Sequence, residues 1–418
     1  MQDFQIFILS ILLCLFLVQC SHHSASKKAE HQIPEHIKEL DSLTVYPADP
    51  RPVYTMKLVP VQSFGGSGKP YWKVITGCAV DDSNRVIISG QKKVSQAGLY
   101  VFNPDGTYQK QVGRFGKGPG EYELASPDFQ INAGRLFLQD EQTKRLSIFS
   151  TDDYAFKKTT SLQNWNVRDL KAVRNMKLSG FLARSDGNLL AIFRGIPTHS
   201  GRTGKTKFML VNPEGNVLNP EPLMELPSPF YIVNKHRGHS MFPLRMQLPF
   251  KGRSLYALSD DDAIYTVPRT EDFLIKKYNA KGTYQSAFYY PVTGPPFDID
   301  SVRGPAFQRA AIRNALKKGD VKRPKTAPVL HKMKIDDENR IWLTVATGRG
   351  KSEWWMLGAS GKLLAKTVAP KHERICDIKN GYLYAKFFDS KGSDDPKNWV
   401  DKVVKYRIKL TKQSKMRK

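Results

Sequence analysis

The chain has 418 residues, of which 40% are hydrophobic and 11% aromatic, and this composition excludes general disorder. A single compact core rarely grows beyond about 250–300 residues, so the chain either splits into domains or repeats a smaller unit. Its formal charge of +26 at pH 7 favours acidic partners, although charge spread evenly for solubility would give the same total. Four cysteines are too few for a disulfide scaffold, and their spacing matches no zinc site.

An apolar leader opens the chain. Residues 4–18 have the length of a signal-peptide core and are too few for a comfortable membrane span. The run ends at Leu17-Val18-Gln19-Cys20, which resembles the lipobox of bacterial lipoproteins. The resemblance implies a lipoprotein signal peptide over residues 1–19, lipid on Cys20, and a membrane-anchored protein of the cell envelope that faces the periplasm or the cell surface. Gln19 is larger than the usual residue before the cysteine, and a basic start is missing, so plain secretion and an uncleaved anchor stay open.

A repeated pair of hairpins follows the polar tether that we predict over residues 20–48. Six segments each contain a short apolar strand, a turn rich in Asn, Asp and Gly, and a second apolar strand, which is typical of a β-hairpin. We place these first turns at residues 81–85, 132–135, 185–188, 251–254, 336–340 and 379–381. A second hairpin lies downstream of most of them, at residues 99–112, 146–159, 208–218, 275–288 and 354–368. Two hairpins make one propeller blade, so the sequence predicts an all-β, six-bladed β-propeller over residues 49–410.

The sixth repeat lacks its fourth strand. After the turn at 379–381, the last complete strand-like run is 403–410, and a basic tail of residues 411–418 follows it. Residues 53–61 form a strand-like run with no repeat of their own. We therefore expect this N-terminal strand to complete the last blade and close the ring, so that no blade lacks a neighbour.

A glycine-rich segment makes the resemblance more specific. Residues 113–122, GRFGKGPGEY, are followed by Ser126-Pro127. This pattern resembles the signature of six-bladed β-propeller lipoproteins of Gram-negative bacteria, a family akin to NHL and TolB-like propellers. The resemblance covers about residues 50–410 and implies the fold and an exported location, but no established activity.

Loop lengths single out one face of the expected ring. In a four-stranded blade, the turns between strands one and two and between strands three and four lie on one face, and all other connections lie on the opposite face. The first set is uniformly short here, whereas the second set, which we call the long-loop face, holds nearly all the long connections. Long loops on a rigid scaffold are the usual seat of binding.

Basic and aromatic residues recur in these loops, which suits an acidic glycan, an acidic peptide or an envelope protein as partner; we expect no nucleic acid partner. The ligand-binding candidates are Arg114, Arg174, Arg202, Lys235, His236, Arg237, His239, Arg303, Arg309 and Trp354. In the alternative interpretation, the aromatic side chains fill blade cores and the cations are simply solvated. Residues 305–318 favour a short helix, either a cap on this face or a solvent-facing filler.

The sequence offers no catalytic arrangement, metal site or cofactor motif. The glycines at 113–120 are not followed by the helix and Lys-Ser or Lys-Thr that a phosphate loop needs. We therefore expect a binding module rather than an enzyme, with no cofactor. Two alternatives stay open. One is a structural subunit of an envelope complex, and the other is a calcium-dependent hydrolase of the lactonase type that would draw on Asp81, Asp128, Asp336 and Asp377.

Two cysteines lie in the body of the chain. Cys78 and Cys376 each precede the first turn of their repeat, on the expected inner strands of the first and last blades. Those blades become neighbours when the ring closes, so we expect the two residues to lie close together and regard them as a candidate disulfide. The alternative is two buried free thiols on packed strands.

Lipidation of Cys20 is directly testable. Metabolic labelling with a fatty-acid analogue should mark the wild-type protein, because the apolar run ends at a cysteine in the lipobox position. The Cys20→Ser variant should stay unlabelled in a gel-based readout, and equal labelling of both proteins would refute the assignment.

Overall fold

The computed structural model describes residues 33–65, 74–93, 96–195, 204–234, 244–248, 250–251, 253–302, 306–370, 373–389 and 400–413. The predicted signal peptide, Cys20, much of the predicted tether and residues 414–418 lie outside these ranges. The chain divides into two units, residues 1–40 and 41–418. The described part of the first unit contains one helical turn, α2 (Glu35–Lys38), and the rest of the description concerns the second. None of the described helices is long and apolar enough to cross a membrane.

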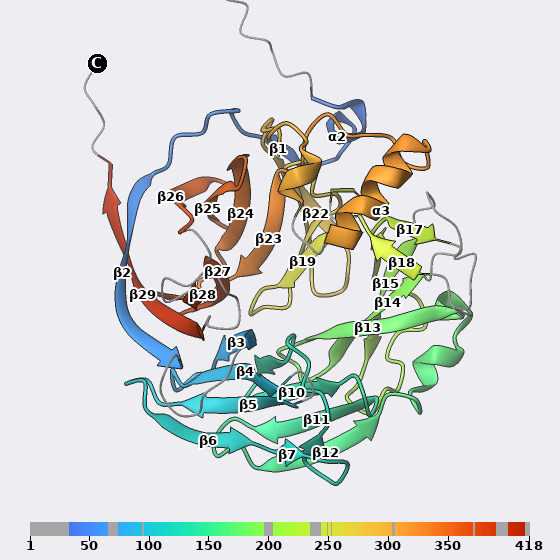
Figure 1. Cartoon of the computed structure of the whole chain (residues 1–418), viewed down its shortest axis with the longest axis vertical. Coiled ribbons are helices and arrows are strands. Elements are labelled where there is room, and N and C mark those ends of the chain that lie inside the picture. Colours follow the sequence, from blue (N-terminus) through green and yellow to red (C-terminus); the bar gives the residue numbers. More distant parts are fainter. Residues whose placement is uncertain are drawn as a thin grey trace, which may run out of the picture. The chain divides into compact units, whose positions relative to one another are not determined.

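Residues 41–418 form the predicted six-bladed β-propeller, in which six antiparallel four-stranded sheets follow one another around a ring (Figure 1). In hydrogen-bonded order from the inner edge outward, the first blade consists of β3 (Val74–Val80), β4 (Val86–Lys93), β5 (Gln96–Phe102) and β6 (Tyr108–Val112), and the second of β9 (Gln130–Asn132), β10 (Arg135–Asp140), β11 (Arg145–Ser150) and β12 (Phe156–Ser161). The third blade consists of β13 (Met176–Ala183), β14 (Leu189–Gly195), β15 (Lys205–Val211) and β16 (Met224–Pro227), and the fourth of β19 (Leu255–Leu258), β20 (Ile264–Val267), β21 (Leu274–Tyr278) and β22 (Tyr284–Tyr289). The fifth blade consists of β23 (Leu330–Ile335), β24 (Ile341–Gly348), β25 (Lys351–Leu357) and β26 (Leu363–Val368), and the sixth of β27 (Glu373–Lys379), β28 (Tyr382–Asp389), β29 (Val400–Lys412) and β2 (Tyr54–Gly65).

The connections between blades contain the remaining elements. They are the parallel pair β7 (Arg114–Phe115) and β8 (Glu121–Tyr122), the short helices η1 (Asn166–Asp169), η2 (Lys171–Val173) and η3 (Ile299–Ser301), the hairpin β17 (Tyr231–Asn234) and β18 (Leu244–Gln247), and helix α3 (Ala306–Lys317). The helix predicted over 305–318 is therefore confirmed.

The N-terminal strand closes the ring as predicted. β2 pairs antiparallel with β29 from Tyr54↔Lys412 to Gly65↔Lys402, so it supplies the outer strand of the last blade. The pairing is longer than the predicted 53–61 and 403–410 segments. Phe64 of β2 is fully buried and packs against Phe102 of the first blade, with ring centroids 6.2 Å apart. The closing strand thus contacts both ends of the propeller.

The predicted tether over 20–48 is wrong at its C-terminal end. Strand β1 (Leu43–Val45) pairs in parallel with β22 and adds a fifth strand to the fourth blade. The Tyr46 ring stacks on Tyr290 at 4.8 Å, and its hydroxyl donates to the backbone carbonyl of Ser360 at 2.9 Å. A three-residue strand followed by an aromatic anchor is too short for period-2 patterning to separate from a loop.

The first turn of the fourth blade also differs from the prediction at 251–254. The LYAL segment (255–258) is the inner strand β19 itself, and the turn follows it, with the Ser259 N–H donating to the Ala263 carbonyl at 3.0 Å. Asp262 takes a φ of 60° in this turn. A short apolar run looks the same as strand one or strand two, so the sequence could not fix the register here.

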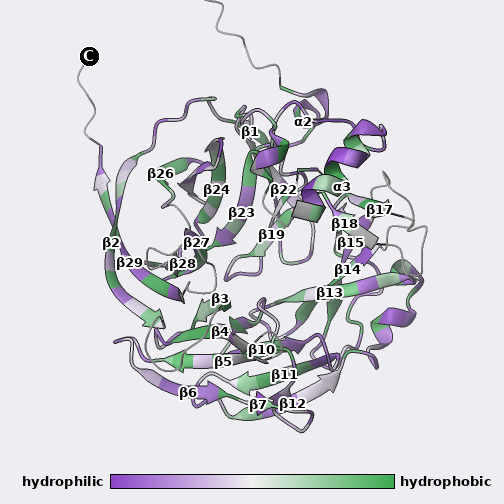
Figure 2. Ribbon diagram, viewed as in Figure 1, coloured by the Kyte–Doolittle hydropathy of each residue, from purple (hydrophilic) through white to green (hydrophobic). Residues whose placement is uncertain are grey.

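The core is a ring of hydrophobic clusters, one at each junction between neighbouring blades. Hydrophobic residues run along the middle strands β4, β5, β10 and β11 of the first two blades in Figure 2, which fits strands that are covered on both faces, whereas the outer strands β6 and β12 are mostly polar. The junction between the last and first blades includes Phe64, Cys78, Tyr100, Cys376 and Tyr384. No single central core is needed, which explains how one domain exceeds the usual core size.

Ring closure predicts a large contrast within one strand. Replacing Phe64 with Ala should lower the free energy of unfolding by about 3–5 kcal/mol, because a fully buried ring at the closing junction is lost. Val61→Ala in the same strand removes a side chain that is 41% exposed and should change stability by less than about 0.5 kcal/mol. Chemical denaturation followed by tryptophan fluorescence measures the unfolding free energy of both variants. A similar small effect for the two would contradict the conclusion that β2 stabilises the closed ring.

Candidate ligand-binding face

The short turns on one face of the ring are built around aspartates. In the first blade, Asp81 Oδ1 accepts the backbone N–H groups of Ser83 and Arg85 at 3.0 and 2.8 Å, and Oδ2 accepts Arg85 Nε at 2.7 Å. Asp336 repeats this arrangement with Arg340 in the fifth blade. Each carboxylate is almost fully buried and already holds its turn together. The Asp-Asp-x-Asn-Arg pattern is therefore a structural feature of the turn.

Polar bonds also join these turns from blade to blade. Asn380 links its neighbours on both sides, since its backbone N–H donates to Asp337 and its side-chain amide donates to Asn84 at 2.8 Å. The Ser185 hydroxyl donates to Asp262 at 2.7 Å between the third and fourth blades. Further links are Lys379–Asp82, Tyr154–Asp81, Gln130–Ala183 and Asp260–Asn339. Together these hydrogen bonds and ion pairs link neighbouring blades at all six junctions. The polar groups on this face therefore serve to stabilise the ring.

Asp377 and Asp128, the other two carboxylates of the hydrolase alternative, have different surroundings. Asp377 Oδ2 accepts the Val80 N–H at 2.8 Å and joins the last blade to the first. Asp128 is exposed in the connection before β9. Within the part of the chain that the structure describes, no group of three or more His, Cys, Asp or Glu side chains could hold a metal ion.

The long-loop face carries an added module. β17–β18 follows strand four of the third blade, and α3 follows strand four of the fourth blade, so both leave from this face. They share a hydrophobic cluster of Phe230, Ile232, Leu248, Phe250, Phe297, Ile312, Ala315 and Val321. Cations lie over two of its rings, with Lys251 4.8 Å from Phe230 and Arg323 5.9 Å from Phe297. The sequence predicted the helix but missed the hairpin, because its two strands have only four residues each.

The predicted ligand-binding residues have different outcomes. The Arg114 side chain is 81% exposed and pairs with Glu121 at 2.5 Å, and Arg174 is exposed after η2. Arg309 is half-buried on α3. The remaining basic candidates, Arg202, Lys235, His236, Arg237, His239 and Arg303, lie outside the described residues.

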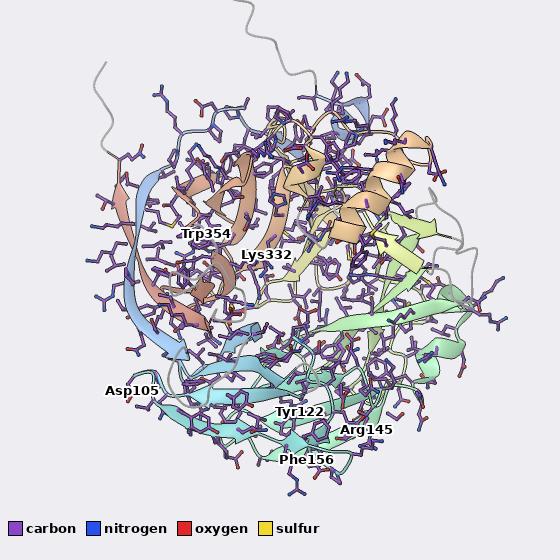
Figure 3. All side chains as sticks on the ribbon, in the orientation of Figure 1. Asp105, Tyr122, Arg145, Phe156, Lys332 and Trp354 are labelled. Carbon is purple, nitrogen blue, oxygen red and sulfur yellow. The ribbon has the colours of Figure 1, made fainter. Side chains whose placement is uncertain are left out.

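Trp354 is wrong as a ligand-binding candidate. Its side chain is 1% exposed and packs with Trp342 and Ile375 between the fifth and sixth blades, within the sheet in Figure 3. Trp355 points to the other side of the sheet, into the junction with the fourth blade. Both aromatic rings fill blade cores, as the alternative interpretation held for such residues.

An arginine pair on the long-loop face escaped the sequence analysis. Arg194 lies near the end of β14 and donates through Nη2 to the Tyr256 hydroxyl at 2.9 Å, while its Nε is buried without a hydrogen-bond partner. Arg253, just before β19, is accessible to solvent, and partial burial together with the charge of Arg194 lowers its pKa. Among the described residues, no carboxylate pairs with either guanidinium. Arg253 was assigned to a turn of the opposite face, because the fourth blade was read one strand out of register.

One comparison with known proteins, a sequence model of a protein family, agrees with the propeller fold. The sequence model of the DUF5128 family, described as a 6-bladed beta-propeller, matches residues 78–237. No curated protein matches the chain.

Alignments with three solved structures cover most of the chain at low sequence identity. A Bacteroides fragilis protein that is inferred to be exported is 12% identical to this chain. The alignment covers 88% of this chain and 100% of the other chain, with a TM-score of 0.47. A member of the duf4221 family from Bacteroides vulgatus is 9% identical over 86% and 99%, with a TM-score of 0.49. The PQQ-bound aldose sugar dehydrogenase of Streptomyces coelicolor is 11% identical over 86% and 100%, with a TM-score of 0.39. At this level of similarity we transfer no activity from them.

The aspartate turns predict a stability effect without a ligand effect. Asp336→Ala should cost about 3–5 kcal/mol of unfolding free energy, because Arg340 and the Trp342 indole N–H, which donates to Asp336 at 2.7 Å, lose a buried acceptor. Glu338→Ala in the same turn removes a partly exposed partner of Arg340 and should cost less than about 1 kcal/mol. Thermal unfolding with and without calcium measures both; a calcium-dependent rise of the midpoint that Asp336→Ala abolishes would instead favour the hydrolase alternative.

Proposed function

We propose that this protein is an exported, lipid-anchored propeller that binds an acidic ligand or partner through its long-loop face. The observation that carries the proposal is that Arg194 of the third blade donates to Tyr256 of β19, the strand that Arg253 precedes, which brings the two cations near each other at the junction of the third and fourth blades. The chemistry that fits them is a carboxylate, sulfate or phosphate group on a glycan, a peptide or an envelope protein.

The electrostatics of the pair favour an anion. Two like charges held close together and partly desolvated disfavour each other, as the lowered pKa of Arg253 reflects. An oxyanion that bridges them would offset this cost and could accept from the Arg194 Nε, which lacks a partner. Guanidinium groups bind such anions through paired N–H donors, which a lysine does not offer.

The neighbouring module supplies apolar contact area. The rings of Phe230 and Phe297 already carry Lys251 and Arg323 over their faces, on the same face of the propeller as the arginine pair. Flat rings next to cations suit sugars with acidic groups as well as acidic peptides. In the sequence, Arg202 falls between β14 and β15 and residues 235–239 fall between β17 and β18, and both segments add positive charge.

Location and family complete the proposal. The apolar leader that ends at Cys20 supports export and a lipid anchor, and the glycine-rich segment at 113–122 supports kinship with NHL and TolB-like propeller lipoproteins. An envelope protein with a net positive charge meets acidic polysaccharides, anionic headgroups and acidic proteins. Binding rather than turnover is therefore the role we assign to this face.

The arginine pair can be tested with a charge-matched control. In Arg194→Gln/Arg253→Gln, affinity for polygalacturonate or polyglutamate should fall at least about tenfold at 150 mM salt, since two charge-assisted contacts are lost. The control Lys57→Gln/Lys409→Gln removes the same charge from an exposed cross-strand pair in the last blade and should change affinity less than about twofold.

Isothermal titration calorimetry measures the affinities of all three proteins. Equal losses in the two double variants would mean that only net charge matters, and this would refute a site at the arginine pair. Unchanged binding in the arginine variant would refute it as well.

A further inference from the structure

The two body cysteines lie together where the ring closes. Cys78 is on β3 of the first blade and Cys376 is on β27 of the last, and the two side chains belong to one buried cluster in which each thiol affects the pKa of the other. Both are free thiols in this structure and belong to the hydrophobic cluster that also holds Phe64 of the closing strand. The predicted proximity is therefore confirmed, while the disulfide stays a prediction.

The surroundings of the two sulfurs differ. The Cys376 sulfur is next to the Cys78 thiol, and Lys332 and Lys334 of the adjacent β23 are close enough to add positive charge. Together these effects lower the pKa of Cys376, against the opposing effects of burial and of Asp377. Burial and the Cys376 partner raise the pKa of Cys78. Lys332 is held in place by donating to the Ile375 carbonyl at 2.6 Å (Figure 3 marks its side chain).

We propose that Cys78 and Cys376 are a redox-modification site in which Cys376 reacts first with a small hydroperoxide and Cys78 then closes a disulfide between the first and last blades. The side chains are 9% and 8% exposed, so a small oxidant suits the site better than a bulky one. The ring-closing junction is held by non-covalent contacts alone in the dithiol form and by an additional covalent bond in the disulfide form.

The chemistry balances in two steps. The Cys376 thiolate attacks a hydroperoxide oxygen, so that an S–O bond forms, the O–O bond breaks, and the leaving oxygen takes a proton to become water or an alcohol. The Cys78 sulfur then attacks the Cys376 sulfenic acid, an S–S bond forms, and the hydroxyl leaves with the Cys78 proton as water. The two thiols are oxidised, and the hydroperoxide is reduced. A small dithiol reverses the change by exchange.

The first experiment uses the full chain with both cysteines. The reduced protein is exposed to hydrogen peroxide, unfolded in the presence of an alkylating agent, and digested without reduction. We expect a linked Cys78–Cys376 peptide pair by mass spectrometry and a rise of several degrees in the thermal midpoint, which dithiothreitol reverses, because the bond constrains the unfolded chain. Complete alkylation of both thiols after oxidation would overturn the proposal, and this readout needs no variant to fold.

The order of attack is tested with single variants. In Cys78→Ser, a dimedone-type probe should trap Cys376 as its sulfenic acid, whereas Cys78 in Cys376→Ser should stay unlabelled under the same exposure. Equal labelling of the two would overturn Cys376 as the attacking thiol.

Lys332 is a positioning residue, and its role is visible in a pH profile. Lys332→Gln should shift the oxidation-rate profile of Cys376 to higher pH and slow the reaction at pH 7 at least about threefold, because less thiolate is present. Lys332→Arg should restore most of the rate, and Lys57→Gln is the charge-matched control. Asp377 of β27 and Tyr384 of β28 also face the pair and are unchanged in these variants. An unshifted profile in Lys332→Gln would overturn the part assigned to Lys332.

Discussion

The antiparallel pairing of β2 with β29 is the constraint on which the rest of this propeller depends. Each blade hides its two faces only if it has a neighbour on each side, so an open ring would expose the junction that holds Phe64 and Tyr384. The closing strand comes from the start of the propeller and completes its last blade, which makes the two ends of the domain a single sheet. Every other junction is local in sequence, and this one joins segments more than 300 residues apart.

Closure lets the two faces of the ring take different roles. On the face of short turns, aspartates such as Asp81 and Asp336 hold turns and arginines, and bonds such as Asn380 to Asp337 join one blade to the next. Carboxylates are thus committed to structure there. The other face carries the β17–β18 and α3 module and the pair Arg194 and Arg253, and neither of these two arginines has a carboxylate partner among the described residues.

Much of the fold could be predicted because it depends on short segments of sequence. Turns such as 81–85 and 336–340 carry residues that favour tight hairpins, and an incomplete last repeat requires a strand from elsewhere, so the blades, the closure and the nearness of Cys78 to Cys376 follow from the sequence. The errors arise where tertiary context decides. Trp354 lies in a strand covered on both sides, which its neighbours in sequence do not reveal, and the LYAL run fits strand one or strand two equally well. The arginine pair was missed for that second reason, since Arg253 is brought to Arg194 by blade packing alone.

The parallel strand β1 bears on how the domain carries mechanical force. The chain enters the propeller at the outer edge of the fourth blade, where β1 pairs with β22 and Tyr46 stacks on Tyr290. It reaches β2 only afterwards. Tension applied through the preceding residues is therefore resisted first by these contacts, and the closing strand carries no load until they give way. The contacts of β1 and Tyr46 therefore have to break before force on the N-terminal segment can open the ring.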